Sequence, residues 1–298
     1  MSSLDIEKIK LQLRKFSKDR NWEQYHNPKN IVMALSVEVS ELLEIFQWSN
    51  NGGLDEIKDP KKKEQIYNEI ADVFNYLVKL VDMLDMDLEK AALKKISDIN
   101  EEILNKKLFP IIFGGEHSIT PGCILPFTKK YKNLCLLHFD AHADLRESYN
   151  GEKFSHASAM KRCLDHKNVS IISFGIRNIS QSEISYLKKN SSRINIFWAK
   201  DKAKWNLKKF KQLIKNKTVY LTFDVDGLDS SIMPATGTPE PGGLFWDETL
   251  NIIKIATKNS NIVGADINEL SPIKGFNSYN FLVAKLAYKI LSYKFLYK

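Results

Sequence analysis

The sequence of 298 residues has only three cysteines, and it has no long apolar run. Cys123, Cys135 and Cys163 form no CxxC pair, which predicts reduced structural thiols in the cytoplasm. Residues 1–10 are polar and charged and lack the apolar segment of a secretion signal. No stretch approaches the length of a membrane span. We therefore expect a cytoplasmic protein that does not bind membranes.

Neither part of the chain lacks charge of one sign, and the net charge is +8. Residues 1–100 hold 15 Lys and Arg against 18 Asp and Glu, and residues 101–298 hold 29 against 18. A basic region of this kind could bind nucleic acid. However, lysines such as those of 208–211 have the spacing of an amphipathic helix between strands, and no nucleic-acid motif accompanies them. We interpret them as a solvated lysine-rich surface and expect no nucleic-acid partner.

Two regions differ in their periodicity, and the length is typical of about two domains. Residues 4–104 contain no convincing strand. They contain four helical stretches, at about 4–20, 30–48, 62–84 and 87–104, separated by Asn27-Pro28, Asn50–Gly53 and Asp59-Pro60. The sequence predicts an all-α domain over 1–102.

From Leu108 onward, apolar strand-like runs alternate with helical stretches. The runs lie at about 108–113, 134–139, 169–174, 194–198, 219–223 and 262–267, and a last helix covers about 279–295. Continuous apolar strands with helical crossovers predict an α/β domain over 103–298, a three-layer αβα arrangement with a mostly parallel sheet. Sites in such sheets lie at the carboxyl ends of the strands.

Acidic and imidazole side chains follow three of these strands. Gly114-Gly115-Glu116-His117, Asp140-Ala141-His142-Ala143-Asp144 and Asp224-Val225-Asp226 together supply four aspartates and two histidines. Like charges are costly to bury together without a counter-charge. This oxygen and nitrogen set suits Mn²⁺, and six ligands indicate two ions. The alternative interpretation is three ordinary strand-end loops with Asp at turns.

These segments closely resemble the ureohydrolases, the arginase/agmatinase family. Ser155-His156-Ala157-Ser158, Pro234–Gly243 and Asp266–Pro272 stand with them in family order, and the resemblance covers about 103–298. It implies an arginase-like fold and hydrolysis of a guanidino compound to urea and an amine. It also implies two Mn²⁺, one bound by His117, Asp140, Asp144 and Asp224, and one by His142 and Asp226 with Asp140 and Asp224 bridging.

The same resemblance implies the roles of further residues. Glu269 would hold the guanidinium, His156 would shuttle a proton to the leaving amine, and Thr238 would help to position the substrate. The context of Arg146 looks closer to agmatinases than to arginases, which indicates agmatine and polyamine metabolism. A cation at Arg146 suits a carboxylate tail better than an amine, so guanidinobutyrate remains an alternative substrate.

One part of the ureohydrolase pattern is absent. The family has two strands before its Gly-Gly-Glu-His segment, and here the helical region occupies that place. The sequence therefore predicts a truncated sheet in which Leu108–Phe113 is an exposed edge. Such an apolar edge invites association.

Acidic pairs also interrupt the apolar helices of the first region. Glu38 and Glu41 lie on one predicted helix, and Glu69 and Asp72 on the next, at a spacing of three. Four carboxylates across one groove would repel unless Mg²⁺ ions bound them. The alternative interpretation is a solvated acidic face.

The runs Arg20–Asn30, Glu38–Trp48 and Glu69–Leu77 resemble the MazG-like nucleotide pyrophosphohydrolases, most closely the dCTP pyrophosphatase branch. The resemblance implies a helical homo-oligomer that hydrolyses a (d)NTP to the monophosphate and pyrophosphate. Glu38, Glu41, Glu69 and Asp72 would bind Mg²⁺, and Trp22, His26, Trp48 and Tyr76 would line the base and sugar pocket. The family's closing Lys-Tyr-Pro tail is absent.

The leading hypothesis is a fusion of two metal-dependent hydrolases. A second hypothesis keeps only the nucleotide pyrophosphohydrolase active, with the truncated ureohydrolase as a metal-binding or oligomerising remnant. A third makes the chain a noncatalytic binding or assembly protein.

Overall fold

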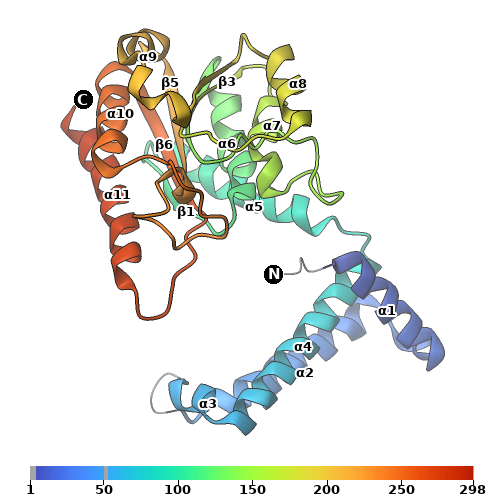
Figure 1. The fold of residues 1–298 in the computed structure, drawn as a ribbon. Helices are drawn as coiled ribbons and strands as arrows, with labels where there is room; N and C mark the ends of the chain where they lie inside the picture. Colours follow the sequence, from blue (N-terminus) through green and yellow to red (C-terminus); the bar gives the residue numbers. More distant parts are fainter. Residues whose placement is uncertain (1–4, 50–52, 298) are drawn as a thin grey trace. The chain divides into compact units, whose positions relative to one another are not determined.

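The computed structural model describes residues 5–49 and 53–297 of the chain (Figure 1). The predicted helix start at residue 4 and the Asn50–Gly52 part of the predicted turn lie outside these ranges. The chain divides into two compact units, one ending at Ala91 and one beginning at Ala92. Across the described ranges, no helix is both long and apolar enough to cross a bilayer.

The described part of the first unit is helical. It contains α1 (Ile6–Asp19), α2 (Pro28–Phe46), α3 (Leu54–Lys58) and α4 (Pro60–Met83), and α5 (Leu88–Asn105) begins in it. Asn27 and Asp59 cap α2 and α4 by accepting backbone N–H groups, and a proline occupies the first turn of each helix. The predicted helical spans thus correspond to α1, α2, α4 and α5, and α2 packs along α4.

Six parallel strands form the sheet of the second unit. They are β1 (Ile111–Phe113), β2 (Leu134–Phe139), β3 (Val169–Phe174), β4 (Ile194–Phe197), β5 (Thr218–Asp224) and β6 (Asn261–Asn268), in the order β1-β6-β5-β2-β3-β4. All six predicted strands are present. Only β1 is clearly shorter than predicted, because Pro110 has no N–H and the Leu108 N–H bonds to the Ile103 carbonyl.

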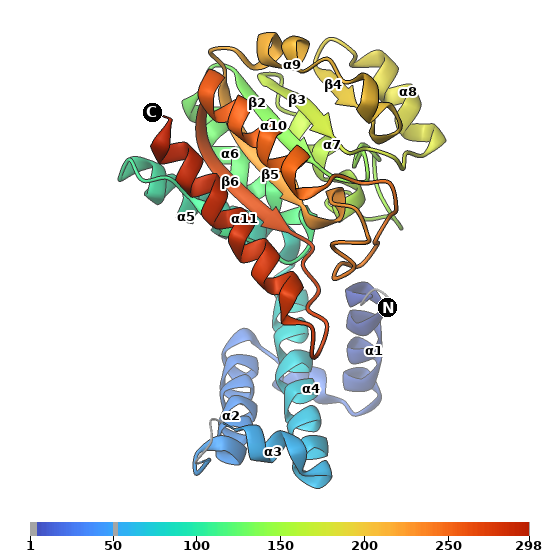
Figure 2. The ribbon, with the colours of Figure 1, turned by 60° about the vertical axis from the view of Figure 1, so that its left-hand side comes forward.

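Helices cover both faces of this sheet (Figures 1 and 2). One face is covered by α9 (Leu207–Ile214), α10 (Trp246–Asn259) and α11 (Asn277–Leu296), and the other by α6 (Thr120–Lys130), α7 (Ala159–Leu164) and α8 (Gln181–Lys189). Along β2, Leu137 and Phe139 point into one core while Leu134 and Leu136 point into the other. A strand buried on both faces explains the continuous apolar runs of the sequence.

The division between the two units falls inside α5. Leu104 is buried in the core beneath α6, and Ile96 packs against it. At Gly122 of α6, an added Cβ would lie 2.9 Å from the Leu93 carbonyl oxygen, so the two helices approach closely. The second half of α5 therefore belongs to the compact α/β unit, which begins earlier than the predicted limit at 102/103. The assignment of 1–102 and 103–298 to two families stays a prediction.

Replacing Leu104 by alanine tests this anchoring of α5. Leu104 is 6% exposed, so we expect a loss of about 2–5 kcal/mol in the free energy of unfolding of the α/β unit. Hydrogen exchange of the β2 amides against denaturant measures this quantity. Ile99→Ala is the matched control, because Ile99 on the same helix is 48% exposed and should change the value by less than about 0.5 kcal/mol. Equal effects of the two variants would contradict the anchoring.

Candidate functional site

The carboxyl ends of four neighbouring strands, β1, β6, β5 and β2, meet at one edge of the sheet. His117 follows β1, Asp140, His142 and Asp144 follow β2, Asp224 ends β5 with Asp226 in the next turn, and Glu269 follows β6. All six side chains predicted to bind Mn²⁺ thus lie together. Because β6 and β5 lie between β1 and β2, the residues that follow these two inner strands join those that follow β1 and β2 at the same edge.

Two imidazoles face the aspartates. His117 Nδ1 lies 3.1 Å from an oxygen of Asp140, 3.1 Å from one of Asp144 and 3.5 Å from one of Asp224. His142 Nδ1 lies 3.0 Å from Asp226 and 3.6 Å from the other oxygen of Asp140. Asp140 therefore stands between the two histidines with one oxygen toward each. A carboxylate that bridges two ions requires this placement.

Negative charge is in excess at this site. Burial, together with the charge of Asp140, raises the pKa of Asp144 to about 6. Burial and the charges of Asp226 and Asp140 raise the pKa of Asp224 well above its ordinary range. Burial disfavours the charged form of His142, but its hydrogen bonds to Asp140 and Asp226 outweigh this and raise its pKa to about 11. The negative charge of these side chains is therefore not fully compensated, and bound divalent cations could compensate it.

The hydrogen bonds of His117 show that the residues fit a metal ion. Within the described ranges, His117 Nδ1 is buried and makes no hydrogen bond, although carboxylate oxygens surround it. Its Nε2 lies 2.8 Å from Thr222 Oγ1, which donates to an Asp266 oxygen at 2.6 Å. The Nε2–H group therefore donates to Thr222, and this bond turns Nδ1 toward the aspartates, where a metal-bound histidine would present its lone pair. These donors suit Mn²⁺.

A third histidine was missed by the sequence analysis. His138, fully buried on β2, lies 2.8 Å from Asp140 through Nε2 and 3.0 Å from Ser173 Oγ through Nδ1. It forms a potential metal-binding group with His117, Asp140 and Asp144. The spacing of two residues between His138 and Asp140 at a strand end was an available indication, since such residues point to the same side.

A cavity of about 390 Å³ opens beside the aspartates. Glu269 lines it and takes a positive φ of 67°, and its backbone N–H bonds to the Gly115 carbonyl at 2.6 Å. One carboxylate oxygen of Glu269 accepts a hydrogen bond from the backbone N–H of His117 at 2.7 Å. Burial raises the pKa of this Glu269 carboxyl group. A positive φ is costly for a residue with a side chain, so the surrounding structure holds Glu269 at this position.

The other predicted site residues of this unit line the same cavity. His156 Nδ1 lies 3.0 Å from Glu116, and this hydrogen bond raises the pKa of His156. Thr238 donates to Asp226 at 3.2 Å. The Nε atom of Arg146 lies 3.8 Å from the buried carboxylate of Glu183. The imidazole of His156, the hydroxyl of Thr238 and the guanidinium of Arg146 thus line one cavity.

Arg177 is a second residue whose role the sequence analysis missed. Its guanidinium donates to the carbonyls of Asp226 and Glu240, both at 2.7 Å, and of Leu228 at 3.2 Å. These bonds join the turn after β5 to the loop that carries Thr238. The charged donor is pre-organised for several acceptors, which lysine cannot imitate.

The first unit also holds an acidic group. Ligand atoms of Glu38, Glu69 and Asp72 all lie within 4.8 Å of one another. Burial raises the pKa of Glu38, and the charges of Glu41, Asp72 and Glu69 raise it further. The four predicted Mg²⁺ ligands are therefore close enough to repel one another, and three are close enough to share an ion.

A cavity of about 450 Å³ lies beside these acids. Trp22, His26 and Tyr76 line it, as the sequence analysis expected, and Lys79 adds a cation. Trp48 is 84% exposed and does not belong to the lining. The cavity thus brings together three of the four residues predicted for a base and sugar pocket.

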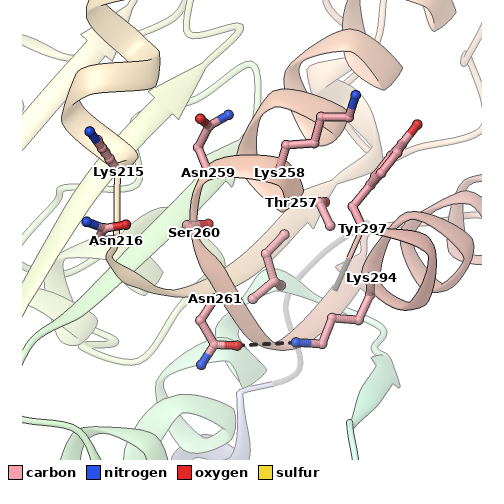
Figure 3. Close-up of a pocket in the computed structure, with 10 residues that line it drawn as sticks. Lys215, Asn216, Thr257, Lys258, Asn259, Ser260, Asn261, Lys294 and Tyr297 are labelled. Atoms are coloured by element: carbon pink, nitrogen blue, oxygen red, sulfur yellow. Dashed lines mark hydrogen bonds between the residues drawn. The ribbon is translucent and has the colours of Figure 1, made fainter.

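A larger cavity, of about 620 Å³, lies at the amino ends of β5 and β6 and holds no carboxylate (Figure 3). Its lysines lie near the carboxyl ends of three helices: Lys215 follows α9, Lys258 belongs to α10 and Lys294 to α11. Lys294 bonds to Asn261 at 3.3 Å. Lysines complement the partial negative charge of helix ends. We therefore interpret this cavity as structural and place no chemistry there.

Replacing Thr222 by valine should weaken Mn²⁺ binding at His117. Valine keeps the shape but removes the hydroxyl that holds His117 Nε2, so we expect roughly a 10- to 100-fold loss of affinity for one of the two ions. Titration calorimetry with Mn²⁺ measures it. Thr222→Ser keeps the hydroxyl and should restore the affinity. Wild-type affinity in Thr222→Val would show that the hydroxyl does not orient the ligand.

Comparisons with known proteins agree with this geometry. A profile described as the arginase family matches residues 53–292. The agmatinase of Bacillus anthracis is 36% identical over 66% of this chain and 68% of its own length. The N(1)-aminopropylagmatine ureohydrolase of Synechocystis is 35% identical over 62% of this chain. The crystal structure of the agmatine ureohydrolase of Thermoplasma volcanium is similar with a TM-score of 0.61 and 30% identity, over 69% of each chain.

The chain spans only 60% of the length of the Synechocystis relative. The family match begins at residue 53 and so includes Glu69 and Asp72, within the region predicted as a separate nucleotide hydrolase. With a profile match over most of the sequence and an αβα sheet that carries the ligand set at its carboxyl edge, the chain belongs to the arginase family.

Proposed function

We propose that the chain hydrolyses the guanidino group of an agmatine-like substrate to urea and an amine. One observation carries this proposal: six potential Mn²⁺ ligands lie together, and four of them, His142, Asp144, Asp224 and Asp226, line one cavity with Glu269 and His156. Ordinary strand-end loops would not require Glu269 and His156 to lie beside the potential ligands.

The proposed roles of the residues follow from their positions. His117, Asp140 and Asp144 on one side, and His142 and Asp226 on the other, would hold two Mn²⁺ ions with Asp224. When bound, such ions make water a strong nucleophile at neutral pH. The carboxylate of Glu269 would bind the planar guanidinium by charge-assisted hydrogen bonds and so orient its carbon.

His156 would supply the proton that the leaving amine needs. Its hydrogen bond to Glu116 raises the pKa of the imidazole, which favours the protonated form near neutral pH. The side chain lies on the cavity wall, where the substrate tail would leave. A general acid at this place protonates the leaving nitrogen, so the carbon–nitrogen bond breaks to give a neutral amine instead of a strongly basic amide anion.

Charge favours a cationic tail over a carboxylate tail. The cavity lining holds one arginine and these six carboxylates: Glu116, Asp144, Glu183, Asp224, Asp226 and Glu269. With Asp140 added, these carboxylates carry more negative charge than two divalent ions and Arg146 together would balance. Arg146 lies near Glu183, so its own charge is compensated. We therefore prefer agmatine over guanidinobutyrate.

Purified protein with Mn²⁺ and agmatine should release urea. Glu269→Gln should lower kcat/KM at least roughly 30-fold, since the loss of one partner of a buried charge pair costs about 2–5 kcal/mol. Metal content, measured by atomic absorption, should stay at two ions per chain. Glu152→Gln, an exposed loop carboxylate, is the control and should leave the rate unchanged.

Absence of urea from agmatine, arginine and guanidinobutyrate, with two ions bound, would contradict the proposal. It would instead favour the hypothesis of a metal-binding remnant. Activity that survives Glu269→Gln at the wild-type level would contradict the assigned role of Glu269 alone.

A second candidate function concerns the first unit, where we propose Mg²⁺-dependent hydrolysis of a (d)NTP to the monophosphate and pyrophosphate. The observation that favours it is the cavity of about 450 Å³ in which Trp22, Tyr76 and Lys79 face Glu38 and Asp72. Stacking aromatics and a cation suit a base and its phosphates. Carboxylates suit Mg²⁺ together with those phosphates.

With Mg²⁺ and dCTP, pyrophosphate should appear, and Glu38→Gln or Asp72→Asn should abolish it. Each substitution removes a charged ligand of the ion. Glu64→Gln changes an exposed acid of α4 and serves as the control. Pyrophosphate release from dCTP and other dNTPs that survives both site substitutions would overturn the assignment, as would its absence from the wild-type protein.

A further inference from the structure

A row of polar side chains crosses the middle of the sheet, on the face that α6 and α7 cover. The strand register sets Asp266 of β6 beside Thr222 of β5. It sets His138 of β2 between Thr222 and Ser173 of β3. All four side chains are buried, with 3% or less of their surface exposed. Because buried polar groups need hydrogen-bond partners, each member of the row must find one within the protein.

Both ring nitrogens of His138 have such a partner. Nε2 lies 2.8 Å from Asp140, and because a carboxylate only accepts, the Nε2–H group donates. Nδ1 of the neutral ring then accepts the hydroxyl of Ser173 at 3.0 Å. A metal-binding histidine presents the lone pair of one nitrogen to the ion. His138 has no lone pair left for an ion while these two bonds are made.

The cavity gives a second reason to set His138 apart from the ligands. In the described part of the chain, the cavity of about 390 Å³ is lined by Asp144 and Asp224 but not by His138. The ring of His138 lies beneath that of His117, with 5.5 Å between the two centroids. His138 therefore contacts the site from the protein interior.

Asp140 is the carboxylate that stands between His117 and His142. Its Oδ1 accepts the backbone N–H of His142 at 2.5 Å, and its Oδ2 accepts the Nε2–H of His138 at 2.8 Å. Oδ2 also lies 3.1 Å from His117 Nδ1, and Oδ1 lies 3.6 Å from His142 Nδ1. Each oxygen thus has one hydrogen-bond donor and keeps a second lone pair for an ion. Without His138, only the His142 N–H would limit rotation of this carboxylate about its Cβ–Cγ bond.

We propose that His138 is a positioning residue and not a metal ligand. Through Nε2 it holds the oxygen of Asp140 that faces His117, and through Nδ1 it is itself held by Ser173. The carboxylate then keeps one oxygen toward each ion, as a bridging ligand must. This inference rests on the dinuclear metal site of the proposed function.

Ser173 determines which edge of the His138 ring faces Asp140. A half-turn of an imidazole exchanges each nitrogen for a carbon, so a turned ring would present a C–H group to the carboxylate. The hydroxyl of Ser173 can bond to Nδ1 in only one of these two orientations. The serine therefore selects the orientation in which Nε2 reaches Asp140.

Two amide variants separate the two nitrogens of His138. The amide nitrogen of glutamine reaches about as far as imidazole Nε2, and that of asparagine about as far as Nδ1. His138→Asn should lose the bond to Asp140 and bind one of the two Mn²⁺ ions roughly 10- to 100-fold more weakly, whereas His138→Gln should stay within about threefold of the wild-type affinity. Titration calorimetry with Mn²⁺ measures both. Equal losses in the two variants would indicate a ligand and overturn the proposal, as would wild-type affinity in His138→Asn.

Ser173→Ala tests the second bond. It should lower the same Mn²⁺ affinity roughly 2- to 10-fold, the effect of one neutral hydrogen bond. Ser170→Ala is the matched control, because Ser170 lies on the same strand but points to the other face of the sheet. Thermal melting of the metal-free proteins checks that each variant folds, and if His138→Asn does not, the two serine variants decide. Equal affinities of Ser173→Ala and Ser170→Ala would overturn the role of Ser173.

Electron paramagnetic resonance gives a measurement that does not depend on urea release. A carboxylate bridge couples the spins of two Mn²⁺ ions, so the wild-type protein should show a coupled signal. His138→Asn loaded with two ions should show weaker coupling, and His138→Gln should restore it. Unchanged coupling in His138→Asn would overturn the proposal. A wild-type protein that binds two coupled ions but releases no urea would contradict the proposed activity alone, and one that binds no pair of ions would contradict both.

Discussion

The second unit depends on the charge gathered at the carboxyl edge of its sheet. Asp140, Asp144, Asp224 and Asp226 are nearly or fully buried within reach of His117 and His142. Buried like charges destabilise a fold unless a counter-charge compensates them. The raised pKa values of Asp144, Asp224 and His142 all report this same deficit of positive charge. Metal ions bound at this group would therefore stabilise the fold as well.

A second set of buried polar residues orients the side chains of this charged group. Asp266 and Thr222 orient His117, while Ser173 bonds to His138, which in turn bonds to Asp140. Arg177 ties the turn of Asp226 to the loop that carries Thr238. Such contacts determine which nitrogen or oxygen faces the cavity, and ligand identity alone does not. The cavity beside them is consequently polar and acidic.

Much of the architecture could be predicted from periodicity. Six apolar runs became six strands, the central ones buried on both faces, and the helical spans of the first region follow their proline and Asx caps. The start of β1 was misplaced because Pro110 and the bond from Leu108 end the ladder early. The unit boundary within α5 could not be predicted either. Ile96 and Leu104 look like any apolar residues of a helix until their partners beneath α6 are known.

The sequence by itself determined the ligand types, their positions at strand ends and the arginase-family pattern, because these depend on local order along the chain. Tertiary structure alone decided that β5 lies beside β2, which sets Asp224 and Asp226 next to Asp140, and that the turn after β1 brings His117 to the same group. It also decided that His138 joins the group. Contacts between residues far apart in the chain arise from packing of whole layers, and no local pattern of residues encodes them.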